Sequence, residues 1–351
     1  MTQKPAKTIP TGSTRVSLKH FKGGESVELK DIRKELLFYY ESRANPNGDP
    51  GFENQPRLMP DGTIIVTDVR IKRTIRDYAA AHLGYEIFVD YDENGNPTTA
   101  DDRAKELIGN LKGDVIKELL LKTFDVPLFG ALVTIRSENT GEGGSHKLTG
   151  PVQFSLGRSV NKVDIINPMI SSKFVGKEKK PKKEGEEIQQ SGTFGKFYAV
   201  DYALIKTQAT INPMNLGKYI ENSDVVKHFM ELESKLASCL WDGTNALVTR
   251  SKYPQRSVFL IEVTYNNAIY NDLSTLVEED AEMKGKTCGL TAKPLKFNKL
   301  IAALHERKQK VTKVRVASCK ELFSDTQHLS EDIKACGIPV EWADVKATDT
   351  A

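Results

Sequence analysis

The order of hydrophobic patterns along this chain of 351 residues limits its fold more than any other feature. The segments with the alternating or aromatic-rich pattern of β-strands are residues 34–41, 148–159, 192–205 and 257–265. Two segments instead repeat apolar side chains at helical spacing, one starting near Asp68 and one spanning 222–243. In chain order the elements are therefore strand, helix, strand, strand, helix and strand.

This order predicts an α+β fold with a βαββαβ core, the arrangement of ferredoxin-like and RNA-recognition-motif domains. Two helices on one face of four antiparallel strands would leave the other face open to a ligand. We expect Asp68 and Ser223 to cap the starts of the two helices, and Gly243 to end the second. Further patterns predict a helix near 297–309, a strand at 310–317 and a helix near 327–336.

A turn of unusual composition joins the first strand to the first helix. Residues 44–50 read ANPNGDP, in which almost every residue favours a turn. The helix beyond it carries Arg70, Lys72, Arg73 and Arg76 within seven residues. Such cations can neutralise several phosphates, and the turn can offer backbone N–H groups and amide side chains beside them. A solvated basic helix next to an ordinary loop explains the same pattern equally well.

A second basic segment lies between the second and third strands. Lysines are concentrated from 173 to 183, with Met169, Phe174 and Phe194 flanking the run. Apolar side chains on a basic hairpin can stack on bases or wedge between them. A solvated loop is the more common origin of such a run. Because the net charge is only +3, any contact with nucleic acid must use local patches of this kind.

The sequence shows no set of catalytic residues with suitable spacing, so we expect neither an enzyme nor a bound cofactor or metal. His146 is the one histidine in a predicted loop, and a lone loop histidine is usually polar surface. Asp49 and Asp68 could hold Mg²⁺, although turn formation and helix capping explain them more simply. The four cysteines form no CxxC pair, which favours reduced thiols in the cytoplasm. No apolar run reaches the length of about 18 residues needed to span a membrane, so no membrane partner is expected.

Several longer motifs follow one another in a specific order. They are NPNGDPGFENQPR, VTDVRIKRTIRDY, LFGA, GPVQFSLGRSV and GTFGKFYAVDYALI. Together they resemble the repeated backbone subunit of type I CRISPR interference complexes (Cascade), over roughly residues 33–265. The likeness is greatest to subtype I-B, followed by subtype I-C.

The resemblance implies a non-catalytic subunit that binds the guide RNA (crRNA). Copies of it would assemble head to tail along the crRNA and present it for pairing with target DNA, leaving cleavage to a separate helicase–nuclease. Further partners would be the large subunit, the small subunit, the subunit that caps a crRNA end and the guide-processing endonuclease. One protein must accept every guide sequence, so its contacts should go mainly to phosphates and sugars.

The resemblance also divides the chain into parts. It implies a palm of the RNA-recognition-motif type, a helical fingers insertion and a β-hairpin thumb. The expected ranges are 1–30 for an N-terminal arm, 31–83, 148–160 and 195–267 for the palm, 84–147 for the fingers, 161–194 for the thumb and 268–351 for a C-terminal α/β appendage.

On this basis the expected RNA contacts are Asn45, Asn47, Gly48, Arg57, Arg70, Lys72, Arg73, Arg76, Gln153, Ser155 and Arg158. The expected thumb residues are Met169, Lys173, Phe174, Thr193, Phe194 and Lys196. Two alternatives stay open from the sequence. One is an RNA endonuclease of the same fold class that uses Asp49 or Asp68, and the other is an RNA-binding module that acts as a monomer.

Overall fold

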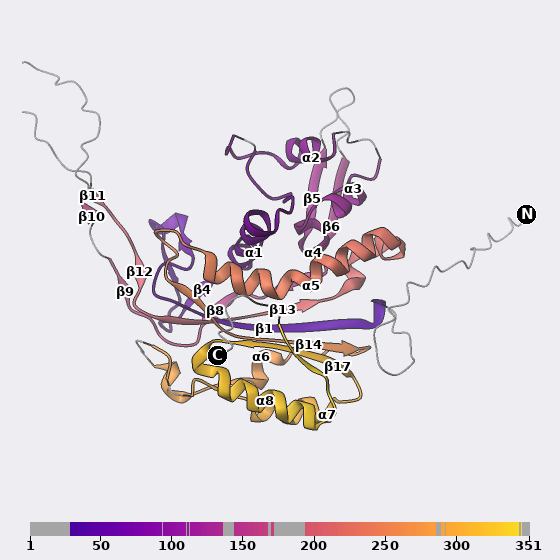
Figure 1. The fold of residues 1–351 in the computed structure, drawn as a ribbon. Coiled ribbons are helices and arrows are strands. Elements are labelled where there is room, and N and C mark those ends of the chain that lie inside the picture. Colours follow the sequence, from indigo (N-terminus) through magenta and orange to yellow (C-terminus); the bar gives the residue numbers. More distant parts are fainter. Residues whose placement is uncertain are drawn as a thin grey trace, which may run out of the picture.

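A large mixed sheet forms the centre of the molecule in the computed structural model (Figure 1). The structure describes residues 29–92, 94–109, 111, 113–135, 144–167, 170–171, 194–285, 289–291, 293–343 and 345. Across the sheet the strands lie in the order β18 (Val340–Trp342), β17 (Val311–Ser318), β14 (Gln255–Asn266), β1 (Ile32–Ser42), β13 (Ala203–Ile211), β8 (Gly157–Ser159), β4 (Ile64–Val66), β3 (Gln55–Leu58) and β2 (Gly48–Asp49), and β7 (Val152–Phe154) also pairs with β13. The α+β class expected from the sequence is confirmed.

The four predicted strands lie side by side in the middle of this sheet. β1 pairs antiparallel with β14 on one side and with β13 on the other, and β13 pairs antiparallel with β7 and β8. Alternate side chains of β1 enter different cores: Leu36 and Phe38 join one hydrophobic cluster, while Leu37 and Tyr39 join another. Since successive side chains of a strand point to opposite faces, both faces of β1 are buried.

Two of the expected strands differ from their predicted extent. The segment 148–159 does not form one strand. The strand is interrupted between β7 and β8, where Leu156 is 56% exposed. The strand expected at 192–205 begins only at Ala203 and runs to Ile211. The preceding residues form the short strands β11 (Phe194–Gly195) and β12 (Ala199–Val200), which pair antiparallel with β10 (Ile170–Ser171) and β9 (Ile165–Ile166).

Helices α1 (Asp68–Leu83) and α5 (Ser223–Ala246) cover one face of the sheet (Figure 1). The expected caps were each displaced by one residue: Thr67 and Asn222 accept the first backbone N–H groups, and Asp68 and Ser223 are already helical. Gly243 does not end α5. A Cβ at this position would lie 3.0 Å from the Tyr78 side chain and 3.1 Å from the Thr74 carbonyl oxygen, so the glycine lets α1 and α5 approach closely.

The insertion after α1 is a separate group of small elements. It contains α2 (Ala100–Ile108), α3 (Val115–Lys122), α4 (Asp125–Phe129) and the antiparallel pair β5 (Gly130–Ile135) and β6 (Gly144–Thr149). Gly109 follows α2 with φ +74°, which ends the helical pattern there. Figure 1 shows this group on the side of α5 that faces away from the sheet.

The opposite face of the sheet is also covered, which contradicts the expectation of an open face. The segments on this face are α6 (Leu273–Leu276), β15 (Glu278–Glu279), β16 (Leu295–Lys296), α7 (Asn298–Glu306) and α8 (Phe323–Ala335). Leu300 and Leu329 belong to the same buried cluster as Leu37 and Phe259 of the sheet. The residues after 268 thus supply the apolar surface that the second sheet face needs.

Shorter elements complete the description. The 3₁₀ segments are η1 (Leu29–Asp31), η2 (Pro50–Phe52), η3 (Pro213–Glu221), η4 (Ala281–Lys284) and η5 (Lys320–Leu322), of which η3 has nine residues with a kink at Gly217. None of the helices within the described ranges is long and apolar enough to cross a membrane.

Candidate nucleic-acid interface

The turn after β1 is fixed to the start of α1 by a single side chain. Asn47 Oδ1 accepts hydrogen bonds from the backbone nitrogen of Thr67 at 2.8 Å and from its hydroxyl at 2.9 Å. Thr67 in turn caps α1 by accepting from the Arg70 nitrogen. The turn therefore sets where the basic helix begins, which is the link that the sequence suggested between the two features.

Gly48 and Asn45 hold the two arms of the turn together. A Cβ on Gly48 would lie 2.7 Å from the Asn54 carbonyl oxygen, so only glycine fits. Asn45 is buried and donates from Nδ2 to that same oxygen at 2.5 Å. Both residues were expected to contact RNA, and the structure gives each a role in shaping the turn.

The two acids considered as metal ligands have protein partners. Asp49 accepts from the Gly51 nitrogen at 3.0 Å and from the Arg57 guanidinium at 2.9 Å. Asp68 accepts from the Lys72 ammonium at 3.0 Å. In the part of the chain that the structure describes, no group of three or more acidic, histidine or cysteine side chains is placed to hold a metal ion.

Three of the four cations of α1 are held in ion pairs of 3.0 Å or less, and the fourth, Arg70, has a longer contact of 3.8 Å with Asp77. Lys72 pairs with Asp68, and Arg73 reaches Asp77 at 2.5 Å and Asp90 at 3.1 Å. Although burial alone would lower the pKa of Arg73, the two carboxylates raise it above its ordinary value. The helix therefore presents much less uncompensated charge than its sequence suggests.

Arg76 is the most completely committed of these residues. It is 7% exposed and donates from Nε at 2.7 Å to Asp125, which is fully buried. Asp125 also accepts from the backbone nitrogens of Phe88 and Val89. The pair joins α1 to the insertion, and a phosphate could reach Arg76 only if this contact broke.

Arg70 lies in a different environment, at the edge of the turn. Its guanidinium donates to the Thr74 hydroxyl at 2.9 Å and lies 3.8 Å from Asp77. It lines a small pocket together with Tyr40, Pro46 and Gln255. Burial lowers the pKa of Arg70 below its ordinary value, although Asp77 acts to raise it.

The loop 247–254, between α5 and β14, brings cations to this place that sequence reasoning did not select. Lys252 donates from Nζ to the Asn45 carbonyl oxygen at 2.7 Å, and the Asn45 nitrogen donates to the Ser251 carbonyl oxygen. Burial and the nearby Arg70 lower the pKa of Lys252 to about 8. Tyr253, the next residue, has 61% of its surface exposed. The only signal in the sequence was an aromatic residue among three cations in TRSKYPQR (249–256).

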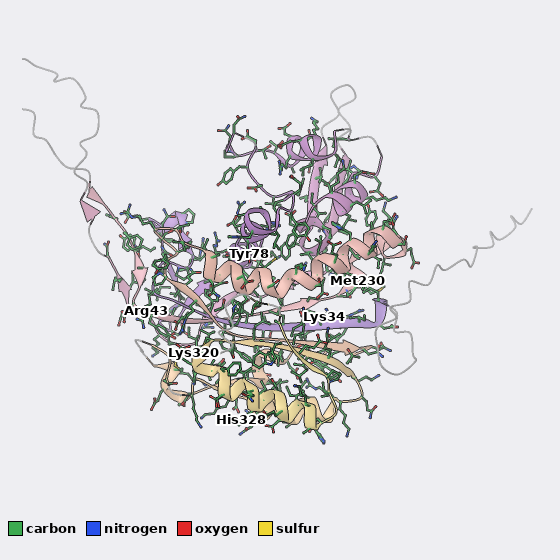
Figure 2. All side chains as sticks on the ribbon, in the orientation of Figure 1. Lys34, Arg43, Tyr78, Met230, Lys320 and His328 are labelled. Atoms are coloured by element: carbon green, nitrogen blue, oxygen red, sulfur yellow. The ribbon has the colours of Figure 1, made fainter. Side chains whose placement is uncertain are left out.

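The segment 196–198 reaches the same surface from the other direction. Lys196 Nζ pairs with the Glu53 carboxylate at 2.8 Å, and the Tyr198 hydroxyl donates to it at 2.9 Å. Arg250 lies over the Phe197 ring, 6.0 Å from its centroid. The turn, the loop 247–254 and the segment 196–198 are thus joined by direct contacts at one end of the sheet, near the labelled Arg43 in Figure 2. We call this assembly, with Arg57, Arg70, Lys196, Arg250 and Lys252 as its cations, the basic end surface.

Two of the expected RNA contacts lie away from this surface. Gln153 stands opposite Thr210, which stands opposite Glu35 of β1. Glu35 precedes Ser42, the last residue of β1, by seven positions, roughly 23 Å of extended strand. Ser155 uses its hydroxyl to accept from the Gln208 nitrogen, and Gln208 pairs with Leu37 in the ladder.

Arg158 lies nearer to the basic end surface, on β8. Its guanidinium donates to the Thr63 hydroxyl at 3.0 Å and to the carboxylate of Asp61. Both side chains of the pair with Asp61 are about half exposed, so solvent screens the interaction. An exchange of Asp61 for a phosphate would cost little at such a site.

Most of the expected thumb residues cannot be placed. Met169, Lys173, Phe174 and Thr193 lie outside the described residues. Phe194 is described only in its backbone, where it pairs with Ser171 in β11 and β10. Lys196 is the one expected thumb residue whose side chain the structure describes, and it lies on the basic end surface.

Comparison with known proteins gives one consistent result. The family model described as "CRISPR-associated protein Cas7" matches residues 32–300. A CRISPR-associated protein Cas7 from Haloferax volcanii is 34% identical over 152 residues, an alignment that spans 38% of this chain and 44% of that relative, less than half its length.

Solved structures give a weaker likeness. A chain of a CRISPR RNA-guided surveillance complex matches with a TM-score of 0.45 and 13% identity, over 82% of this chain and 88% of the other. A chain of a surveillance complex in a pre-nicking state matches with a TM-score of 0.42 and 10% identity, over 82% and 93%.

Proposed function

The chain belongs to the family of CRISPR-associated protein Cas7, and we propose from this that it is a non-catalytic, crRNA-binding backbone subunit of a type I Cascade complex. The observation that carries the proposal is the family match itself. It spans residues 32–300 and so includes β1, α1, α5, β14 and all segments of the basic end surface.

The sheet topology supports assigning a ferredoxin-like palm. The strands β14, β1, β13 and β7/β8 lie in this order with antiparallel pairing, and α1 and α5 cover one face. We assign the fingers to the insertion that holds α2 to β6. We assign the thumb to the segment that leaves through β9 and β10 and returns through β11 and β12, at the same end as the basic end surface.

The basic end surface is suited to a ligand whose sequence varies. Its cations and exposed Tyr253 can contact phosphates and stack on a base, and neither contact depends on base identity. With both faces of the sheet covered, we place the RNA along this end of the sheet and not across the sheet face. We propose head-to-tail copies along one crRNA, pairing of the exposed guide with target DNA, and partnership with the other Cascade subunits. Subtype I-B is the assignment we favour.

The rival reading, an RNA endonuclease, rests on Asp49 or Asp68. The Asp49 carboxylate accepts hydrogen bonds from Arg57 and Gly51, and the Asp68 carboxylate accepts one from Lys72. Each therefore has a structural partner in place of a metal ion or an RNA hydroxyl. No observation on the described residues favours the endonuclease over the scaffold.

The proposal predicts binding that is independent of guide sequence. Fluorescence anisotropy with the full chain and three crRNAs of equal length and unrelated spacers should give dissociation constants within about threefold, with a steep fall in affinity as salt rises. Electron microscopy of the same mixtures should show extended assemblies whose length follows the length of the guide.

Three outcomes would contradict this. Affinity for only one spacer would indicate base readout. Cleavage of the crRNA or of a complementary RNA in Mg²⁺, abolished in Asp49→Ala, would establish the nuclease. Compact particles of one copy per RNA would favour the monomeric binding module.

A further inference from the structure

Lys252 and Arg70 are two cations drawn together by the fold from positions far apart in the chain. Lys252 donates to the Asn45 carbonyl oxygen at 2.7 Å, and the next residue in the turn, Pro46, lines the same pocket as Arg70. Gln255, three residues after Lys252, lines that pocket too. The loop 247–254, the turn and α1 therefore meet at this point.

The charges around the pair do not balance it. Asp77 lies 3.8 Å from Arg70 but is shared with Arg73, which it meets at 2.5 Å. The phenol of Tyr40, from β1, is neutral, because burial raises its pKa above the ordinary value. Among the described residues no carboxylate lies within ion-pairing distance of Lys252, whose one bonded partner is a neutral carbonyl. Placing partly buried cations together without a counterion costs free energy unless a ligand supplies the negative charge.

Both side chains keep donors for such a ligand. An ammonium group has three N–H donors, and Lys252 uses one on Asn45. A guanidinium has five, and Arg70 uses one on Thr74. A phosphate group offers several acceptor oxygens and a full negative charge. It can therefore pair with the Lys252 ammonium and accept two hydrogen bonds from the planar Arg70 guanidinium.

We propose that Arg70 and Lys252 together hold one phosphate group of the guide-RNA backbone at the junction of the turn, α1 and the loop 247–254. The assignment rests on the proposed function. It adds Lys252, which the charge pattern of the sequence did not select. It also gives Arg70 a different role from the other three α1 cations, which carboxylates hold closely. Binding at this site is coupled to protonation, since only the ammonium form of Lys252 attracts the phosphate.

The direction of the coupling follows from the pKa of Lys252, which burial and Arg70 lower to about 8. Below pH 8 the ammonium form is ready to bind. Above it, the protein must take up a proton when the phosphate arrives, so affinity falls as pH rises. An arginine at this position stays charged throughout the range and removes this dependence.

The test uses the full chain and a short single-stranded RNA of mixed sequence, with anisotropy measured from pH 6.5 to pH 9.5. Lys252→Met should weaken binding roughly tenfold at pH 7 and reduce the salt slope by about 0.7, the value for one phosphate contact on a single strand. Lys252→Arg should restore the affinity and flatten the pH profile. Arg70→Gln should weaken binding by a similar factor.

Lys227→Met is the matched control. Lys227 is an exposed lysine near the start of α5 (Ser223–Ala246), and the loop 247–254 follows the far end of this helix, 19 residues further on or about 28 Å along its axis. The control should bind as the unchanged protein does. Competition with inorganic phosphate tells a free phosphate ion from an RNA phosphate as the ligand of the Arg70–Lys252 site. Inorganic phosphate should compete weakly with RNA, and Lys252→Met should abolish this competition. RNA that binds far more tightly than inorganic phosphate identifies the backbone phosphate as the ligand.

Three results would overturn the inference. They are unchanged affinity and salt slope in Lys252→Met, no recovery of binding in Lys252→Arg, and the same pH profile in all variants. If the unchanged protein binds RNA while these results hold, only the phosphate site fails. If it does not bind RNA at all, the proposed function fails first.

Discussion

Helix α1 and the loop 247–254 both bring cations to the same end of the sheet, but they keep them in different states. On α1, Lys72, Arg73 and Arg76 each face a carboxylate. On the loop, Lys252 faces a carbonyl oxygen and a second cation. The helix has the denser charge in the sequence, while the loop has the more available charge in the structure. The number of cations in a segment therefore does not measure its capacity to bind an anion.

The two states also differ in what they do for the fold. A buried ion pair such as Arg76–Asp125 holds two parts of the chain together and is strongly destabilising to break. A partly buried lysine without a counterion lowers stability as long as it is charged. Substitutions in the two regions should thus change stability in opposite directions.

The largest effect is expected for Arg76→Ala. It leaves the carboxylate of Asp125 buried with two backbone donors and no counterion, which should cost about 3–5 kcal/mol of unfolding free energy. Urea denaturation followed by circular dichroism measures this loss. A change below about 1 kcal/mol would mean that the Arg76–Asp125 pair does not stabilise the fold. The contrast between the paired cations of α1 and the unpaired Lys252 of the loop would then disappear.

A smaller effect of opposite sign is expected for Lys252→Met. The folded-state pKa of Lys252, about 8, lies below its ordinary value of 10.5, so folding disfavours the charged form. This penalty is fully present below pH 8 and disappears as pH rises above 10.5. The variant should be more stable than the parent at pH 7, by roughly 1 kcal/mol after solvent screening is allowed for.

Thermal unfolding at pH 7 and pH 10 measures this difference, with Lys227→Met as the control. The advantage of Lys252→Met should shrink at the higher pH. A variant that is less stable at both pH values would show that the hydrogen bond to Asn45 outweighs the buried charge, and the contrast with Arg76 would be lost.

The smallest effect is expected for Arg73→Ala. Its partners Asp77 and Asp90 are part-exposed, and exposed ion pairs contribute about 1 kcal/mol or less. Because these carboxylates already neutralise Arg73, RNA affinity and its salt slope should hardly change. A fall in the salt slope of about 0.7 would instead support the phosphate contact predicted from the sequence and would give α1 the larger share of the interface.

Four of the core elements could be predicted to within a few residues, while the strands expected at 148–159 and 192–205 could not. β1, β14, α1 and α5 were recognisable because each follows one strict period of apolar residues, and such periods report local geometry. The failures occur where a contact with another element overrides the local pattern. Leu156 fits an alternating pattern but falls where β7 ends, and Gly243 has the composition of a helix end but packs against α1. No single-sequence pattern contains the partner that decides either case.

The candidate site was predictable in part. The turn at 44–50 and Arg70 were identified from composition and charge, and both lie on the basic end surface. Lys252 was missed because its importance comes from Arg70, 182 positions earlier in the chain. Gln153 was included because it alternates with buried residues, although the sheet register places it toward the other end.

By itself the sequence determined the order of strands and helices, the turn that only Gly48 can make and the motifs of the Cas7 family, because these depend on neighbouring residues. The tertiary structure alone decided which charges are paired and that both faces of the sheet are covered. Ion pairs such as Arg76–Asp125 and the covering of Leu37 and Tyr39 join residues that are distant in the chain. Their energies depend on burial and distance, which exist only once the chain has folded.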